Sequence, residues 1–197
     1  IIKVNKNIVL VIMSGRPLDL SWEDQNIPAI VQAWHLGSKS GDAIAQVLYG
    51  DYNPSAKLTM SFPRNVGQVP VYYNFKNTGR PSTSIEQVTN SGYADVENSP
   101  LYPFGYGLSY TEFTYSDFKI SSDKIKKSNS NKPKSKEIIV ASINVKNTGS
   151  LKGKEVVQLY IRDVVGSITR PVKELKGFKM IELAPGESRT VNFEINE

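Results

Sequence analysis

The sequence predicts an α/β segment followed by an all-β sandwich, and it predicts that both are incomplete. The continuous apolar run from Ile8 to Met13 is typical of a strand buried on both faces, as in parallel sheets. From Phe113 onward, apolar and polar residues alternate with a period of two, which indicates strands with one buried face. The first part offers too few strands and helices to cover both faces of a parallel sheet, so we expect it to be the tail of a larger domain.

The first part continues with a second strand, a helix and a third strand. Ala29 to Trp34 is a short strand-like apolar run. The stretch "SKSGDAIAQVLYGD" predicts a helix with four apolar residues on one face: Ala43, Ile44, Val47 and Leu48. We expect Ser38 or Ser40 to cap this helix and Gly50 to end it in the left-handed conformation. "KLTMSF", Lys57 to Phe62, is then predicted as a strand that a proline stops.

The sandwich part is predicted to hold five antiparallel strands separated by the turn clusters "NTGS" and "APGES". They lie near residues 113–120, 137–147, 155–163, 174–183 and 188–196. A closed immunoglobulin-like sandwich usually needs about seven strands. We therefore expect the last strand to be an unpaired edge, and the sandwich to self-associate or to be unstable.

The positive charge is concentrated in one segment. Residues 121–137, "SSDKIKKSNSNKPKSKE", hold six lysines against Asp123 and Glu137, which is 6 − 2 = +4 of the formal net charge of +5. The segment has no arginine and no aromatic residue on which a base could stack. We expect a solvated, mobile loop and no nucleic-acid partner.

Several classes of protein and of site are excluded or disfavoured. The absence of cysteine excludes disulfides, zinc–thiolate sites and cysteine nucleophiles. No apolar run reaches the length of a membrane span, and the first residues lack the pattern of a secretory leader. We therefore expect the chain to begin either as a mature protein or within a longer one.

Candidate chemical residues are few. "GYGLSY" lacks the third glycine and the preceding strand of a dinucleotide fingerprint, and no phosphate loop or nucleophile elbow occurs. His35 is the single histidine, and we interpret it as a packed or capping side chain. Glu23 and Asp24 follow the first strand, where a sugar-facing role is conceivable, but a role as solvated loop charges is favoured. Asp51 is interpreted as turn chemistry.

Aromatic residues are dense in the middle of the chain. Residues 72–118 hold 11 of the 19 aromatics. Aromatic faces stack on sugar rings, but they also fix long irregular segments onto neighbouring surfaces. For "PLYPFGYGLSY" we favour the second role. Residues 80–92 are polar and are predicted to form a mobile excursion.

Five blocks, in order along the chain, carry a family resemblance. They are "GDAIAQVLYGDYNPSAKLTMSFP", "VPVYYNFK", "PLYPFGYGLSYTEFTY", "VKNTGSLKGKEVVQLYIRD" and "RPVKELKGFKMIELAPGES". Together they resemble the C-terminal part of glycoside hydrolase family 3, the β-glucosidase and β-xylosidase group. The chain departs from the family pattern at Ala56 and Thr59, where glycine and proline are usual, and the family continues through two further strands.

The resemblance implies a domain organisation. Residues 1–70 would be the tail of an α/β sandwich domain, 71–112 an aromatic connector, and 113–197 a fibronectin type III-like domain without its last strands. A (β/α)8 barrel would precede them. The resemblance favours a periplasmic or secreted location, although cytoplasmic members occur.

The resemblance also implies retaining hydrolysis of terminal non-reducing β-D-glucosyl or β-D-xylosyl residues by an aspartate nucleophile and a glutamate acid/base. Neither acid matches any residue here, so we assign no catalytic, cofactor or metal residue to this chain and expect the isolated segment to be inactive. Its expected partners are the rest of the parent enzyme and, through it, a β-linked oligosaccharide. The alternative function is a carbohydrate- or protein-binding sandwich, which requires an exposed aromatic platform, for which Tyr160 offers one ring.

Overall fold

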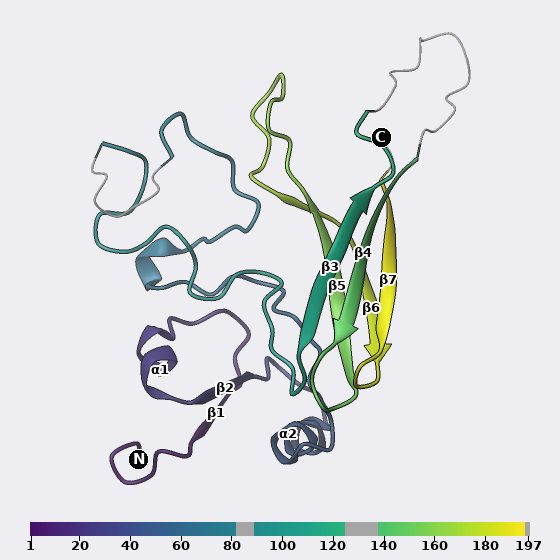
Figure 1. Cartoon of the computed structure of the whole chain (residues 1–197). Helices are drawn as coiled ribbons and strands as arrows, with labels where there is room; N and C mark the ends of the chain where they lie inside the picture. The colour runs from purple at the N-terminus through teal and green to yellow at the C-terminus, as the bar shows by residue number, and fades with distance from the viewer. Residues whose placement is uncertain (82–88, 125–137, 196–197) are drawn as a thin grey trace. The chain divides into compact units, whose positions relative to one another are not determined.

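The computed structural model describes residues 1–81, 89–124 and 138–195, which form two compact units (Figure 1). Unit 1 comprises residues 1–52, 57–107 and 162–173, and unit 2 comprises residues 53–56, 108–161 and 174–197. The predicted polar excursion falls largely on residues 82–88 and the predicted lysine-rich loop largely on 125–137, so both predictions concern residues outside the described ranges.

Unit 1 contains the two predicted parallel strands. β1 (Val9–Ile12) pairs with β2 (Ala29–Gln32) in parallel, from Val9 opposite Ala29 to Ile12 opposite Gln32. Both strands are shorter than the apolar runs that predict them. Between them lies α1 (Ser21–Asn26), a short helix where the sequence predicts a loop.

The predicted helix is present as α2 (Ser40–Tyr49), and its end is as expected: Gly50 has φ 82°, in the left-handed region. The predicted serine cap is wrong. The residue before the helix is Lys39, which makes no side-chain capping bond. Its ammonium group instead lies 3.1 Å from the Asp42 carboxylate in the first turn, where the helix dipole favours an acidic side chain.

The predicted strand at Lys57–Phe62 is also wrong, although the segment is extended alongside another. Leu58 and Phe62 exchange backbone hydrogen bonds with residues 101–106, and Phe62 forms an isolated antiparallel bridge with Tyr102. The partner segment is "LYPFGY", in which Pro103 has no N–H and Gly105 has φ 83°, so a continuous ladder cannot form.

Unit 1 has a small core. Ile12, Leu20 and Phe62 are buried, and partly buried residues surround them: Leu10, Leu18, Ile30, Trp34, Leu58, Leu101 and Tyr102. The short 3-10 helix η1 (Val66–Gln68) follows this cluster and buries the Gln68 side chain. Phe62 is the centre of the core, because it is only 1% exposed and touches both aromatic neighbours, Trp34 and Tyr102.

Unit 2 holds all five strands of the predicted sandwich. They are β3 (Phe113–Ile120), β4 (Ile139–Asn147), β5 (Gly153–Ile161), β6 (Glu174–Leu183) and β7 (Ser188–Ile195). One sheet has the order β3-β4-β7 and the other pairs β5 with β6, all antiparallel. Among the described residues β7 pairs on one side only, with β4.

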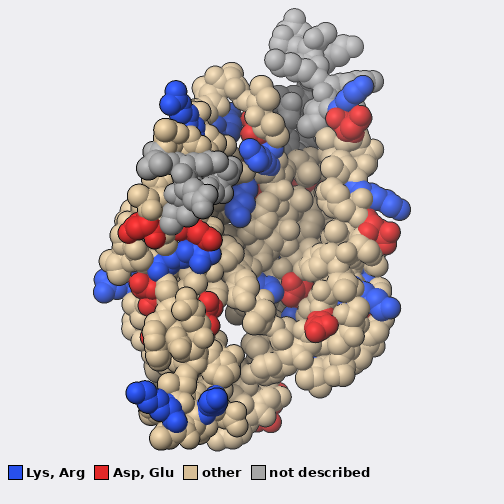
Figure 2. Space-filling view, turned by 60° about the vertical axis from the view of Figure 1, so that its left-hand side comes forward, with Lys and Arg blue, Asp and Glu red and all other residues tan. Residues whose placement is uncertain are grey.

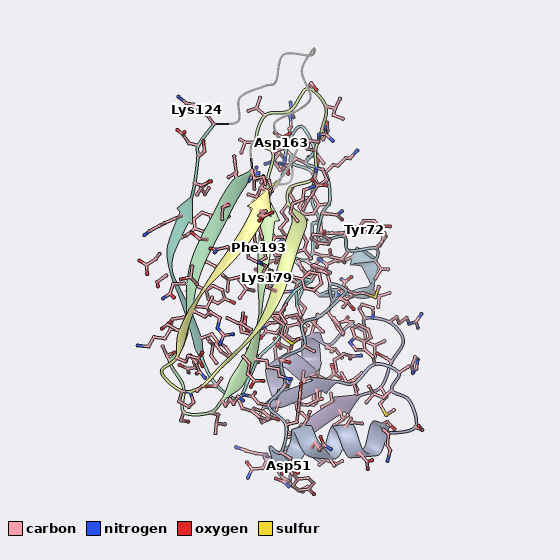
Figure 3. All side chains as sticks on the ribbon, turned by 90° about the vertical axis from the view of Figure 1, so that its right-hand side faces the viewer. Asp51, Tyr72, Lys124, Asp163, Lys179 and Phe193 are labelled. Carbon is pink, nitrogen blue, oxygen red and sulfur yellow. The ribbon has the colours of Figure 1, made fainter. Side chains whose placement is uncertain are left out.

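The sheets of unit 2 enclose a second core, made of Val145, Val157, Ile181, Leu183, Val191 and Phe193. At the edge of this core, the Lys179 side chain lies over the Phe193 ring in a cation–π contact, with its ammonium nitrogen 5.5 Å from the ring centre (Figure 3). Alternating burial along β4 and β5 confirms the period of two that predicted these strands.

Asn147, at the end of β4, connects the loops of unit 2. It is completely buried, and its side-chain oxygen accepts bonds from the Thr111 hydroxyl at 2.8 Å and the Gly149 N–H at 3.1 Å. Its amide donates to the carbonyls of Leu151 and Leu183 at 2.8 and 3.1 Å. All four hydrogen-bonding positions of this amide are used, which explains how a polar side chain is tolerated there.

Among the described residues on the face shown in Figure 2, charges of both signs are intermixed, and they form no single-sign patch of the kind that binds nucleic acid. The described part of the chain contains no helix long and apolar enough to cross a membrane.

Candidate functional site

A hollow with a volume of about 590 Å³ lies in unit 1. It begins at the loop that follows β1, and its walls come from three regions of the chain: residues 16–19, 59–74 and 104. The lining residues are Arg16 to Asp19, Thr59 to Ser61, Pro63, Val66, Val69 to Asn74, and Phe104. In open α/β sheets, ligands bind beyond the carboxyl ends of the strands, so the position is that of a candidate site.

The aromatic wall of the hollow is built from residues distant in the sequence. The rings of Tyr73 and Phe104 are stacked, with centroids 4.3 Å apart and planes inclined by 17°. The N–H of Phe104 donates to the Ser61 hydroxyl at 3.1 Å, which holds this wall against the neighbouring segment. Tyr72 is 64% exposed (Figure 3), so this wall presents an apolar ring to solvent.

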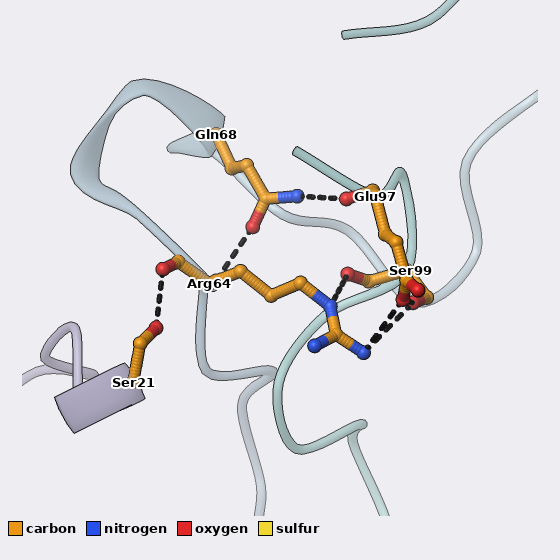
Figure 4. A network of polar contacts seen from close by, with 5 residues as sticks. All are labelled: Ser21, Arg64, Gln68, Glu97 and Ser99. Atoms are coloured by element: carbon orange, nitrogen blue, oxygen red, sulfur yellow. Dashed lines mark hydrogen bonds and ion pairs between the residues drawn. The ribbon is translucent and has the colours of Figure 1, made fainter. Parts of the chain in front are cut away.

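A polar network supports the segment that carries the hollow's rim (Figure 4). The Arg64 guanidinium lies 2.9 Å from the Glu97 carboxylate and donates to the carbonyl and hydroxyl of Ser99. The buried Gln68 amide accepts from the Arg64 N–H and donates to the Glu97 carbonyl, each at 2.6 Å. The Ser21 hydroxyl of α1 donates to the Arg64 carbonyl. The network fixes η1, and with it Val66 and Val69, relative to α1.

Asp24 is exposed to solvent, as predicted, but it lies on the helix α1 and not in a loop, and it is a hydrogen-bond acceptor. Its carboxylate accepts from the Tyr102 hydroxyl at 2.5 Å. Burial of the phenol, the hydrogen bond and the negative charge of Asp24 all raise the pKa of Tyr102 above its usual value near 10. Tyr102 also stacks on Tyr106 at 5.4 Å and packs edge-on against Phe62. The aromatic segment is therefore fixed onto unit 1, in the role that the sequence favoured.

The other predicted residues do not converge on the hollow. Glu23 lies on α1 and is half-buried, and Asp51 is exposed at the end of α2 (Figure 3). His35 is exposed and packs over the turn after β1: a Cβ on Gly15 would lie 2.8 Å from the His35 Nε2 atom. Beside it, Trp34 has φ 52°, a conformation that costs about 1–3 kcal/mol and is held by packing against Phe62.

The hollow has little capacity for acid–base chemistry. Asp19 is the single acidic residue in its lining, and its carboxylate accepts the Ser21 N–H at 3.0 Å. A second, more polar hollow of about 490 Å³, formed by Asn77 and residues 162–172, is lined by one carboxylate as well, Asp163. Retaining glycosidases need two carboxyl groups about 5–5.5 Å apart. Within the described ranges no group of three or more His, Cys, Asp or Glu residues could hold a metal ion.

Sequence reasoning identified the aromatic density but missed the hollow. Its walls meet only after the chain folds, and no local period marks them. One signal was available: "VGQVPVYY" places several large apolar residues in a stretch with no helical or strand period, which indicates surface that something else covers.

The comparisons with known proteins give the family. Residues 1–110 match the glycosyl hydrolase family 3 C-terminal domain, and residues 155–197 match a fibronectin type III-like domain. This chain belongs to glycosyl hydrolase family 3. The predicted resemblance and the predicted fold class, α/β followed by a fibronectin type III-like sandwich, are therefore confirmed.

The relatives in family 3 are much longer than this chain. A periplasmic beta-glucosidase of Salmonella typhimurium is 52% identical over 192 residues, which are 97% of this chain and 24% of the relative. A beta-xylosidase of Formosa agariphila is 42% identical over 197 residues, covering 98% of this chain and 25% of the relative. The crystal structure of a beta-glucosidase from Listeria innocua matches with a TM-score of 0.87 at 40% identity, over 99% of this chain and 26% of that chain. This family 3 chain thus spans about a quarter of the length of these relatives and is their C-terminal portion.

Proposed function

We propose that this chain is the C-terminal scaffold of a retaining β-glycosidase that removes terminal non-reducing β-D-glucosyl or β-D-xylosyl residues. The observation that carries the proposal is the match to the C-terminal quarter of relatives named beta-glucosidase and beta-xylosidase. The nucleophilic aspartate and the glutamate acid/base are contributed by the portion of the parent protein that precedes this chain.

The arrangement of acids supports this division of roles. Each of the two described hollows is lined by a single carboxylate, whereas glycoside hydrolysis with retention needs a facing pair. In the proposal, residues 1–70 complete the α/β domain behind the acid/base loop, residues 71–112 connect it to the sandwich, and residues 113–197 brace the outside of the enzyme.

The test compares this chain with its parent on aryl β-glucosides and aryl β-xylosides. The parent is expected to hydrolyse at least one class of substrate at catalytic rates, and the isolated chain is expected to give background hydrolysis only. Turnover by the isolated chain at rates comparable with those of the parent would refute the division of roles. Failure of the parent to hydrolyse either class would refute the activity.

One observation favours a second candidate, a carbohydrate-binding sandwich. Tyr160 of β5 donates to the Gln158 side chain at 2.6 Å, so both residues lie on the outer face. The register places Phe178 opposite Gln158, and Phe178 is 67% exposed. Its neighbour Gly177 faces the core, where an added Cβ would lie 3.0 Å from Phe193. The outer face thus has two rings where the sequence reading counted one.

Affinity electrophoresis in a gel containing a soluble β-glucan distinguishes this candidate. Binding by the outer face predicts retardation that the changes Tyr160→Ala and Phe178→Ala each weaken. The scaffold role predicts no retardation of the unaltered chain.

A further inference from the structure

We propose that the hollow of unit 1 is the docking surface for an apolar segment of the preceding, catalytic portion of the parent polypeptide. The inference rests on the proposed function, because it requires the longer protein. It adds the identity of the surface through which the scaffold contacts the catalytic portion, namely the lining around Val66, Val69, Tyr72 and Met60.

The apolar side chains of this surface are open to solvent in the isolated chain. Val66 is 73% exposed, Val69 61%, Tyr72 64% and Met60 48%, and all four line the same hollow. Single exposed apolar residues are ordinary, but several that surround one concave surface mark a site of contact with another surface.

The surface is formed in advance of binding. The Tyr73–Phe104 stack fixes one wall, and the network around Arg64 and Gln68 fixes the segment that carries Val66 and Val69 (Figure 4). A rigid surface loses little conformational entropy when it is covered, so such bracing favours binding.

The chemistry of the lining favours polypeptide over sugar. Prolines, valines, leucine and methionine make up much of it, and its charged side chains are those of Arg16 and Asp19. Thr59, Ser61 and Asn74 also line the hollow, but most of its surface is apolar, and sugar hydroxyl groups buried against the apolar part would lack hydrogen-bonding partners, which is costly. The Arg16 guanidinium makes no hydrogen bond or ion pair with any described residue, so it is available to a carboxylate at the edge of the incoming segment.

The relatives are much longer than this chain, and the unmatched portion is the source that we propose for the segment that docks in the hollow. About three quarters of each relative lies outside the part that this chain matches. The described part of unit 1 has only two parallel strands, β1 and β2, and parallel sheets are normally covered on both faces. In the proposal, the preceding portion of the same polypeptide, which every copy of the parent carries, supplies the segment that covers the hollow.

Thiol accessibility tests the proposal, because this chain has no cysteine of its own. Val66→Cys introduces a thiol into the hollow, and Val164→Cys is a matched control, since Val164 is 78% exposed and lines the second hollow, which the proposal leaves uncovered. Each change is made in the 197-residue chain and in the parent. Reaction with a maleimide is followed by peptide mapping, which separates these thiols from any in the preceding portion.

In the 197-residue chain both thiols are expected to react at similar rates. In the parent, Val66→Cys is expected to react at least tenfold more slowly, with Val164→Cys unchanged. Equal rates for Val66→Cys in chain and parent would overturn the proposal, as would equal slowing at both positions. Concentration-dependent protection in the 197-residue chain would assign the hollow to a second copy, and protection by added cellobiose would assign it to sugar; either overturns it. Hydrolysis of aryl β-glucosides by the unaltered parent is measured separately, so that failure of the activity is distinguished from failure of this surface.

Discussion

The change Phe62→Ala tests the structure of unit 1 most severely. Phe62 is 1% exposed and lies between Trp34 and Tyr102, with ring centroids 5.9 and 6.2 Å away. Truncation of a buried phenylalanine to alanine costs about 3–5 kcal/mol. The two aromatic contacts place this site toward the upper part of that range. Phe178→Ala removes the same atoms from a side chain that is 67% exposed, and surface changes of that kind stay within about 0.5 kcal/mol.

Urea unfolding followed by tryptophan fluorescence measures the effect, because both tryptophans, Trp22 and Trp34, belong to unit 1. With an m-value of about 2 kcal/mol/M, the expected loss lowers the midpoint by about 2 M, or unfolds unit 1 in the absence of urea if its stability is smaller. Phe178→Ala should leave the midpoint unchanged. The described packing would be refuted if Phe62→Ala shifted the midpoint no more than Phe178→Ala does.

Three further predictions concern a turn, a buried amide and the tyrosines. Gly50→Ala forces a side chain into φ 82° and should destabilise α2 by about 1 kcal/mol, measured by chemical denaturation; no loss would contradict the left-handed cap. Asn147→Ala leaves four partners unpaired, two of them in buried hydrogen bonds, and should cost about 3 kcal/mol, seen as faster amide exchange in β4 and β7; unchanged exchange would contradict its role. The pKa values of Tyr102 and Tyr115 are raised, chiefly by burial and by bonds to Asp24 and Glu155, so the unfolded tyrosines ionise first. The stability that these two raised pKa values add is fully present below pH 10 and is lost as pH rises above it. The urea midpoint should therefore fall between about pH 10 and 12, and it should fall less steeply in Tyr102→Phe. A midpoint that does not change with pH in this range would contradict the raised pKa values.

The sandwich was predictable because its signal is local. Alternation in "EVVQLYIRD" and "SRTVNFEIN" places every second side chain on one face, and a strand needs nothing else to reveal which face is buried. Gly50 was predictable for the same reason, since one residue type suits the left-handed end of a helix.

The elements that the sequence predicted wrongly, or did not predict, are those whose structure depends on tertiary contacts. "KLTMSF" has a strand's composition, but its partner segment contains Pro103 and cannot form a continuous ladder. α1 is too short for an apolar period; the one local signal was Asp19, whose side chain accepts the Ser21 N–H as the helix begins. The hollow could not be predicted, because its lining joins residues from three regions spread between Arg16 and Phe104.

The exposed ring of Phe178 was missed for a related reason. Phe178 lies in "LKGFKMIEL", where Gly177 interrupts the alternation of apolar and polar residues. The sequence pattern therefore does not show which face of the strand the Phe178 side chain occupies. The structure resolves this through the register between β5 and β6 and through the close approach of Gly177 to Phe193.

Trapping of the covalent intermediate tests the central claim most directly. A retaining glycosidase forms a glycosyl–enzyme bond to its carboxylate nucleophile, and a fluorinated β-glucoside or β-xyloside that reacts but hydrolyses slowly leaves that bond in place. Peptide mapping of the labelled parent should find the sugar on a carboxylate outside residues 1–197. A label on any aspartate or glutamate of these 197 residues would contradict the account.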